Sequence, residues 1–327
     1  MTGIIGIGVG AGLVSALLTR VVATGSPIAL LLFFLAPLPV AIAALGWNHK
    51  AGLVAAAVGS IALAVAPLFF GGRVNLYMAA VHAISTSLPA WWFSFLALLA
   101  RPGAAPGQPA EWYPPGRILA WIAGVAAVVT ILGVASIATD YETFVRVFGR
   151  TVTTLFERIN PGLFDRIPEA DRPAARGAIA ALLASVAPPV SAALSVFVSA
   201  ALLVIAGRAV LASGRLPRPW PALAALTLPK ILLPIMVAAL AGSFLGGFFG
   251  LALRTVFAAL FAAYALQGLA LAHALTAGAS GRAAILATGY GLCVLFGGWP
   301  LVLAALAGVA DALFNIRAKR GLAPTNA

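Results

Sequence analysis

The chain has 327 residues, of which 62% are hydrophobic and only 9% are charged, and its mean hydropathy is +1.07. About a quarter of the residues of a soluble domain carry charge, so this composition excludes an ordinary soluble fold and favours a membrane protein. Much of the formal charge of +12 comes from single Lys and Arg residues at the ends of apolar segments, which is typical of contacts with lipid headgroups rather than of a nucleic-acid surface.

Nine stretches are apolar enough to cross a bilayer. Each crossing must be a helix of roughly 20 residues, because lipid offers the backbone no hydrogen-bond partners. The pattern predicts an all-α, polytopic integral membrane helical bundle with eight or nine transmembrane helices and one interfacial amphipathic helix. We expect a single membrane domain at 1–316 and a short basic tail at 317–327. The predicted segments are 3–19, 27–46, 51–70, 76–100, 118–139, 177–205, 231–251, 255–275 and 283–314.

The first segment carries a stripe of small residues, Gly8, Gly12 and Ala16, at a spacing of four. Such a stripe lets a second helix approach closely. That helix belongs either to the same bundle or to a partner membrane subunit, and the sequence leaves both alternatives open.

The fourth segment contains a polar cluster. His82, Ser85 and Thr86 fall on one helical face directly before Pro89, and Trp92 follows. Aromatic rings with a few convergent polar groups are typical of a small-molecule pocket. The alternative is that the hydroxyls satisfy backbone groups freed by a proline kink, with the tryptophan at the membrane interface.

Two linkers have distinct compositions. Residues 101–117 are rich in Pro and Gly and predict an extended loop. In 140–160, apolar residues recur mostly at steps of three and four, with arginines elsewhere on the wheel and Thr139 and Glu142 placed as a capping box. This predicts an amphipathic helix that either lies flat on the membrane or packs on the end of the bundle.

The last two segments hold the remaining candidates. Tyr264 and Gln267 are three residues apart, and they predict either hydrogen bonding between helices or contact with a ligand. Asp311 is an acidic residue within a predicted segment and needs a basic partner. We expect Arg254 and Arg317 to form this charge cluster, with a structural role.

Orientation follows from basic residues, which are more frequent on the cytoplasmic side. Nine crossings with a cytoplasmic C-terminus place the tail on the inner side with Arg20, Arg73, Arg254 and the arginines of 140–176. The same arrangement puts the basic stretch 208–218 outside. If that stretch is cytoplasmic, one of the last three segments does not cross, and Pro300 makes the last segment a candidate for a broken, re-entrant helix.

The last segment reads Gly308-x-x-Asp311-x-x-Phe314-x-x-Arg317, followed by a basic tail. Together with YALQG at 264–268 and APLP at 36–39, it resembles the YybS-like family of predicted bacterial membrane proteins, a domain of unknown function, over nearly the whole chain. That family is distantly similar to the substrate-binding S components of energy-coupling-factor transporters. In S components a small-residue stripe on the first helix docks on a membrane coupling subunit with ATPases. The resemblance implies this role for Gly8, Gly12 and Ala16.

The resemblance implies a non-catalytic transport subunit that binds a small molecule in the bacterial cytoplasmic (inner) membrane. The alternative is a cell-envelope scaffold without ligand that recruits partners through 140–160. We expect no enzyme, cofactor, metal site or nucleic-acid partner, because the sequence has no GxxxxGK[ST] motif and its three histidines lie on different predicted elements. The candidate pocket is His82, Ser85, Trp92, Tyr264 and Gln267.

Overall fold

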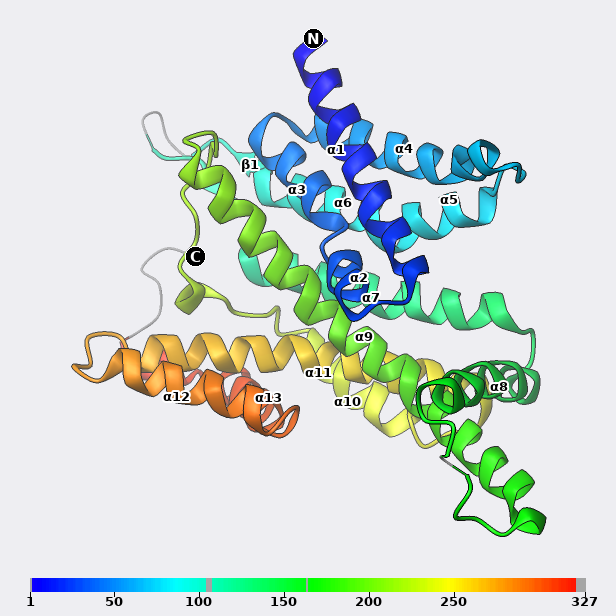
Figure 1. Ribbon diagram of the computed structural model, residues 1–327. Helices are drawn as coiled ribbons and strands as arrows, with labels where there is room; N and C mark the ends of the chain where they lie inside the picture. The colour runs from blue at the N-terminus through cyan, green and yellow to red at the C-terminus, as the bar shows by residue number, and fades with distance from the viewer. Residues whose placement is uncertain (1, 104–107, 163, 322–327) are drawn as a thin grey trace.

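The computed structural model describes residues 2–103, 108–162 and 164–321, and about four fifths of the chain is helical (Figure 1). The helices are α1 (Thr2–Arg20), α2 (Pro27–Phe34), α3 (Pro37–Gly46), α4 (His49–Val65), α5 (Leu76–His82), α6 (Leu88–Leu98), α7 (Pro115–Ile137), α8 (Tyr141–Ile159), α9 (Arg172–Ala212), α10 (Leu232–Gly242), α11 (Gly247–Leu275), α12 (Arg282–Leu295), α13 (Trp299–Phe314) and α14 (Ile316–Lys319). Short 3₁₀ turns are η1 (Val21–Thr24), η2 (Ala66–Phe70), η4 (Glu169–Asp171) and η5 (Leu223–Ala225), and η3 (Ala83–Ser87) is a π turn.

Six helical stretches among the described residues are long and apolar enough to cross a membrane: Gly3–Thr24, Pro27–Gly46, His49–Phe70, Pro115–Ile137, Glu169–Ala212 and Gly247–Leu275. Large apolar side chains cover their outer faces. Leu17, Leu31 and Ile61, for example, are each more than 60% exposed. An apolar exterior of this kind fits a multi-pass membrane protein, because lipid is the solvent that such side chains prefer.

Several predicted segments differ from the structure, and a turn at 35–36 also divides segment 27–46 into α2 and α3. The fourth is interrupted by η3, which separates α5 from α6. Segment 231–251 ends early in α10, and a glycine turn with Gly247 at φ +67° starts α11 as one long helix. Segment 283–314 is two shorter helices, α12 and α13, separated by a turn with Gly297 at φ +60°. Glycine adopts positive φ angles without steric cost, so it allows a tight turn inside an apolar stretch. Hydropathy alone does not show such a turn.

The long helix α9 organises the bundle (Figure 1). Its 41 residues correspond to about 62 Å of helix, roughly twice the hydrocarbon thickness of a bilayer. Helices α3, α7, α8 and α11 all pack on it, and Ala192, Val196 and Ala206 of α9 lie fully buried in the main core. Helix α9 therefore joins the N-terminal helix α3 to the central helices α7, α8 and α11.

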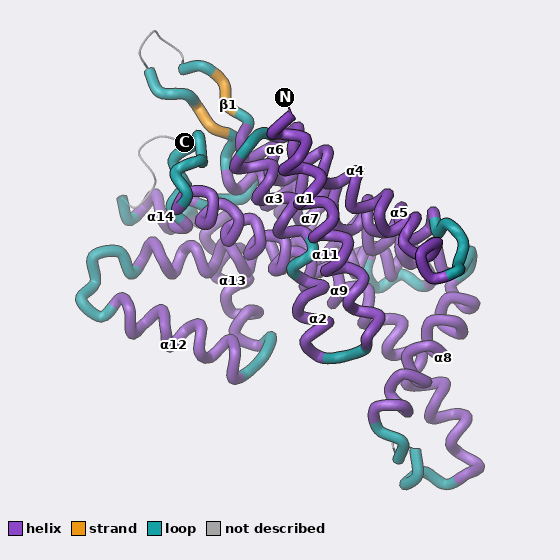
Figure 2. The backbone as a smooth tube through the Cα atoms, turned by 45° about the horizontal axis from the view of Figure 1, so that its top comes forward, coloured by secondary structure: helices purple, strands orange, loops and turns teal. Residues whose placement is uncertain are grey.

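Helix α8 matches the predicted amphipathic segment. Phe144 on its inner face is fully buried, whereas Val147 and Leu155 are exposed. The N-cap is Asp140, whose carboxylate accepts a 2.8 Å hydrogen bond from the Thr143 backbone N–H, so the predicted cap at Thr139 was one residue early. This hydrogen bond lowers the pKa of Asp140. Figure 2 shows α8 beside the beginning of α9, away from the centre of the bundle.

The predicted extended loop contains a small hairpin, β1 (Ala100–Arg101) and β2 (Glu111–Trp112), paired antiparallel. The loop after α9 packs against it. Buried Arg218 donates a 2.7 Å hydrogen bond from Nη1 to the carbonyl of Ala97, and its guanidinium lies over the Trp112 ring. This Arg ties two distant loops together at one end of the molecule.

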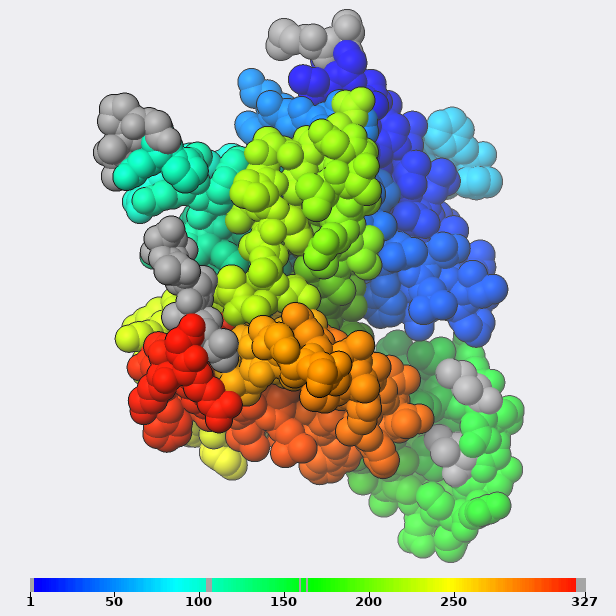
Figure 3. All heavy atoms as spheres, turned by 90° about the vertical axis from the view of Figure 1, so that its left-hand side faces the viewer, coloured from blue at the N-terminus to red at the C-terminus, as the bar shows by residue number. Residues whose placement is uncertain are grey.

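The C-terminal segment contacts the loop that follows α9. Arg317 Nη1 donates to the carbonyls of Ala224 (2.7 Å) and Leu226 (2.9 Å), which belong to the loop that also carries Arg218. Figure 3 shows this face, with the end of α9 above the C-terminal segment. The C-terminal segment is thus held against the loop that follows the stretch 208–218. The α12–α13 hairpin returns the chain to this loop.

Candidate functional site

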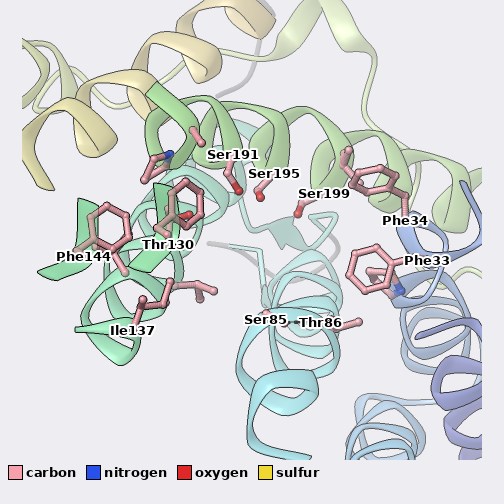
Figure 4. A pocket seen from close by; sticks show the side chains of 18 residues that line it. Phe33, Phe34, Ser85, Thr86, Thr130, Ile137, Phe144, Ser191, Ser195 and Ser199 are labelled. Atoms are coloured by element: carbon pink, nitrogen blue, oxygen red, sulfur yellow. Dashed lines mark hydrogen bonds between the residues drawn. The ribbon is translucent and has the colours of Figure 1, made fainter. Parts of the chain in front are cut away.

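A cavity of about 540 Å³ opens between α2, η3, α7, α8 and α9 (Figure 4). Its size falls within the range of about 300–1,000 Å³ that is usual for small-molecule sites. The lining residues are Phe33, Phe34, Pro37, Ser85, Thr86, Val129, Thr130, Gly133, Val134, Ile137, Phe144, Phe148, Ala187, Pro188, Ser191, Ser195, Val198 and Ser199. A small second hollow of about 30 Å³ continues from Pro37, Ser85, Thr86 and Ser199 toward Leu203.

Helix α9 supplies a row of hydroxyls to one wall. Ser191, Ser195 and Ser199 are four residues apart, so they lie one above the other on a single helical face. Figure 4 shows their oxygens directed into the cavity. Most helical serines and threonines of this chain donate to a preceding carbonyl, as Ser94 does to Ala90, but the described residues give the three α9 hydroxyls no hydrogen-bond partner.

The opposite wall is shaped by the π turn. Pro89 has no N–H and its ring conflicts with the carbonyl of Ser85, and the wider turn of η3 accommodates this clash. The turn brings Ser85 and Thr86 to the cavity, where their hydroxyl oxygens are 3.3 Å apart. Two of the lining hydroxyls bond to their own helices. Ser85 donates to the carbonyl of Val81, and Thr130 of α7 donates to the carbonyl of Ala126.

Aromatic rings close the two ends. Phe33 and Phe34 of α2 lie at one end, and Phe144 of α8 lies at the other, stacked on Phe148 with ring centroids 5.2 Å apart (Figure 4). None of the lining residues is charged or a histidine. Across the described residues there is also no group of three or more His, Cys, Asp or Glu placed to hold a metal ion. The cavity offers hydroxyls and apolar surface.

Of the five predicted pocket residues, only Ser85 lines this cavity. Trp92 lies in an aromatic cluster with Phe95 and Trp121, at centroid distances of 5.6 and 5.4 Å. Tyr264 is completely buried in the main core, and its hydroxyl has no partner among the described residues. The structure does not bring the predicted pocket together as one site.

His82 faces away from the cavity, toward α1. Its Nδ1 lies 3.2 Å from Thr19 Oγ1 and its Nε2 3.5 Å from Ser15 Oγ. Both hydroxyls donate their own protons elsewhere, Ser15 to the carbonyl of Ala36 and Thr19 to that of Ser15. A neutral imidazole donates from one ring nitrogen only, so the tautomer decides which of the two hydroxyls accepts from His82. The expectation that His82 and Ser85 share a face was wrong, because the π turn changes the helical phase after His82.

The small-residue stripe is occupied within the chain. A Cβ added to Gly8 would lie 2.7 Å from the carbonyl oxygen of Ala51, and one added to Gly12 would lie close to Ala55 and Gly59 of the same helix, α4. Ala16 is buried along the same face. Of the two alternatives, the structure uses this face for packing α1 on α4, which leaves it covered.

Gln267 and Asp311 form a structural cluster. Gln267 Oε1 accepts from the Leu228 N–H at 2.8 Å, and its Nε2 donates to Asp311 Oδ2 at 3.2 Å. Arg317 Nε lies 3.0 Å from the same carboxylate oxygen, whereas Arg254 donates to the carbonyl of Ser243 instead. The expected pairing of Asp311 with Arg254 was wrong, since Arg254 lies near the start of α11, where its side chain reaches the end of α10.

The α9 serines were not predicted from the sequence. Their spacing of four after Pro188 and Pro189 was the available signal, and it is the same kind of signal that identified Gly8 and Gly12. Comparisons with protein-family models, with curated proteins and with solved structures found no match to this chain.

Proposed function

We propose that this chain is a multi-pass membrane protein that binds a small molecule in the cavity beside α9 without transforming it. The observation that carries the proposal is a row of three hydroxyls, those of Ser191, Ser195 and Ser199, which have no hydrogen-bond partner in the described part of the chain and are directed into a cavity of ligand size. A polar group without a hydrogen-bond partner is costly in an apolar surrounding, and a bound ligand would remove that cost.

Binding is favoured over catalysis by the chemistry of the lining. Acid–base and nucleophilic catalysis need a titratable group beside the reacting atoms. The cavity presents hydroxyls and phenylalanine rings, and the histidine nearest to it along the chain, His82, is turned toward Ser15 and Thr19.

For the membrane arrangement, we propose that the end carrying the C-terminal segment is cytoplasmic. The loops at that end include Arg215, whose guanidinium lies 4.7 Å from the Trp47 ring centroid, and Arg218 over Trp112. Basic residues beside tryptophans are typical of a membrane interface, and basic residues are enriched on the cytoplasmic side. The apolar helices α10, α12 and α13 are shorter than a standard span. In this arrangement they would also lie within the membrane, beside the six longer helices.

Docking through Gly8 and Gly12 on an energising partner has no support from the packing, because α4 covers that stripe. If an ATPase-containing complex works with this chain, it would have to contact another surface. The binding proposal does not depend on such a partner.

The test uses a cavity-filling variant and a matched control. Ser195→Phe places a ring in the cavity, and Val190→Phe makes a comparable change on an exposed face of the same helix. We expect wild type and Val190→Phe, gently purified from native membranes, to carry near-stoichiometric amounts of one organic compound, as measured by extraction and mass spectrometry. Ser195→Phe should lose it. Equal retention by both variants, or no compound in wild type, would reject the proposal.

A further inference from the structure

The cavity opens in the middle of an uncharged helical stretch. Helix α9 has no charged residue between Arg176 and Arg208, and Ser191 lies one position from the midpoint of that interval. Ser191 is exposed, as are Ser85, Gly133 and Ile137 on the facing elements. If α9 crosses the bilayer, this mouth opens at the depth of the acyl chains, about 23 Å along the helix from the nearest charged residue of α9, Arg176.

The cavity extends along α9. Its lining on that helix runs from Ala187 to Ser199, which is about 18 Å of helix. Phenylalanine rings stand at both ends (Figure 4). A cavity of this length with a largely apolar lining fits an extended hydrocarbon chain better than a compact, strongly hydrated molecule.

The lining of the cavity disfavours a charged ligand. A buried ion needs a partner of opposite charge, and the lining holds none. The hydroxyls of Ser191, Ser195 and Ser199 form a ladder along the groove, with Thr86 across from it. Such a ladder can donate to, or accept from, a hydroxyl or carbonyl group on the ligand.

We infer that the ligand is a neutral, chain-like lipid with a hydroxyl or carbonyl group, which enters sideways from the bilayer through the mouth at Ser85 and Ser191. This rests on the proposed function and specifies its substrate class. The alternatives, a water-soluble compound or an anionic lipid, are outcomes of the test.

The test uses photoreactive probes of equal chain length in phosphatidylcholine nanodiscs: a diazirine-bearing hexadecanol, hexadecane and palmitate. In wild type we expect hexadecanol to label the peptides 129–137 and 187–203 about fivefold more than hexadecane, which is what one neutral hydrogen bond contributes. Palmitate at pH 8 should label them less than hexadecanol, and unlabelled hexadecanol should compete.

Two variants separate the cavity from the lipid-facing surface. Ser195→Phe should lose hexadecanol labelling, and Val190→Phe should keep it. The triple variant Ser191→Ala, Ser195→Ala, Ser199→Ala adds no bulk and should label equally with hexadecanol and hexadecane. Stronger labelling by palmitate, or labelling unchanged by Ser195→Phe, would overturn the inference.

Failure of this inference is distinguishable from failure of the proposed function. If the compound retained by purified wild type is water-soluble or anionic and is lost in Ser195→Phe, the cavity binds a ligand but the lipid assignment is wrong. If wild type retains no compound and no probe labels the cavity, both the proposed function and the lipid assignment are rejected.

Discussion

The buried ion pair between Asp311 and Arg317 gives a sharp test of the packing at the C-terminal end. Both residues are at least 95% buried, and Arg317 also donates to carbonyls of Ala224, Leu226 and Gln267. It therefore joins α11 and the end of α13 to the loop that follows α9. Replacing Asp311 with Ala removes the counter-charge and leaves the guanidinium buried.

Breaking one partner of a buried pair typically costs about 3–5 kcal/mol, a large part of the stability of an ordinary domain. We expect this loss in the free energy of unfolding of Asp311→Ala. Arg317→Met should cost at least as much, because it also removes the side-chain donor to the loop carbonyls of Ala224 and Leu226. The exposed pair Arg101–Glu111 is the control: Glu111→Ala should cost about 0–1 kcal/mol.

The assay is reversible unfolding in mixed micelles with increasing sodium dodecyl sulfate, followed by far-ultraviolet circular dichroism. The expected order of stability is wild type and Glu111→Ala first, then Asp311→Ala, then Arg317→Met. A cost for Asp311→Ala below about 1 kcal/mol, like that of an exposed pair, would refute the buried geometry.

Three further changes probe other contacts. Gly308→Ala should destabilise the protein by about 1–3 kcal/mol in the same titration, because its Cβ would overlap a backbone carbonyl of α11. Gly289→Ala is the control, since its Cβ meets open space and the change should be neutral or stabilising. Equal effects of the two changes would contradict the close crossing of α11 and α13. Gly12→Leu should separate α1 from α4 and lower the yield of folded protein, whereas Gly10→Leu should not; a folded Gly12→Leu protein that has lost a partner would instead favour docking. Asp140→Ala should speed hydrogen exchange in the first turn of α8 near neutral pH. Because the folded pKa of Asp140 is lowered, its cap stabilises the helix above the ordinary carboxyl pKa and is lost as pH falls through the lowered value, so the difference from wild type should disappear in acid. A difference that persists there would argue against the cap.

The helical architecture was predictable from hydropathy, because apolar runs of the right length have few alternatives in lipid. The amphipathic segment 140–160 was equally readable, since its period of 3.6 is a local property. For 283–314 the sequence offered a break at Pro300 only as one alternative, because the turn at Gly297, just before that proline, is short and apolar on both sides. Hydropathy averages over such a turn.

The candidate site was harder to predict. Placing His82 and Ser85 on one face assumed a regular α-helix, and one π turn separated them. Ser195 was overlooked because a helical serine usually satisfies its own backbone, and only the three-dimensional arrangement shows that it faces a cavity. The pairing of Asp311 with Arg317 rather than Arg254 depended on how α13 returns, which residue spacing alone does not fix.

The most direct test of the bilayer-ligand assignment is an experimental structure of the protein in lipid nanodiscs, examined along α9. We predict one continuous, chain-shaped density running between Phe34 and Phe144, with a polar group within hydrogen-bond distance of Ser191, Ser195 or Ser199. A groove that is closed by its own side chains, or that holds only separate water peaks, would contradict the assignment.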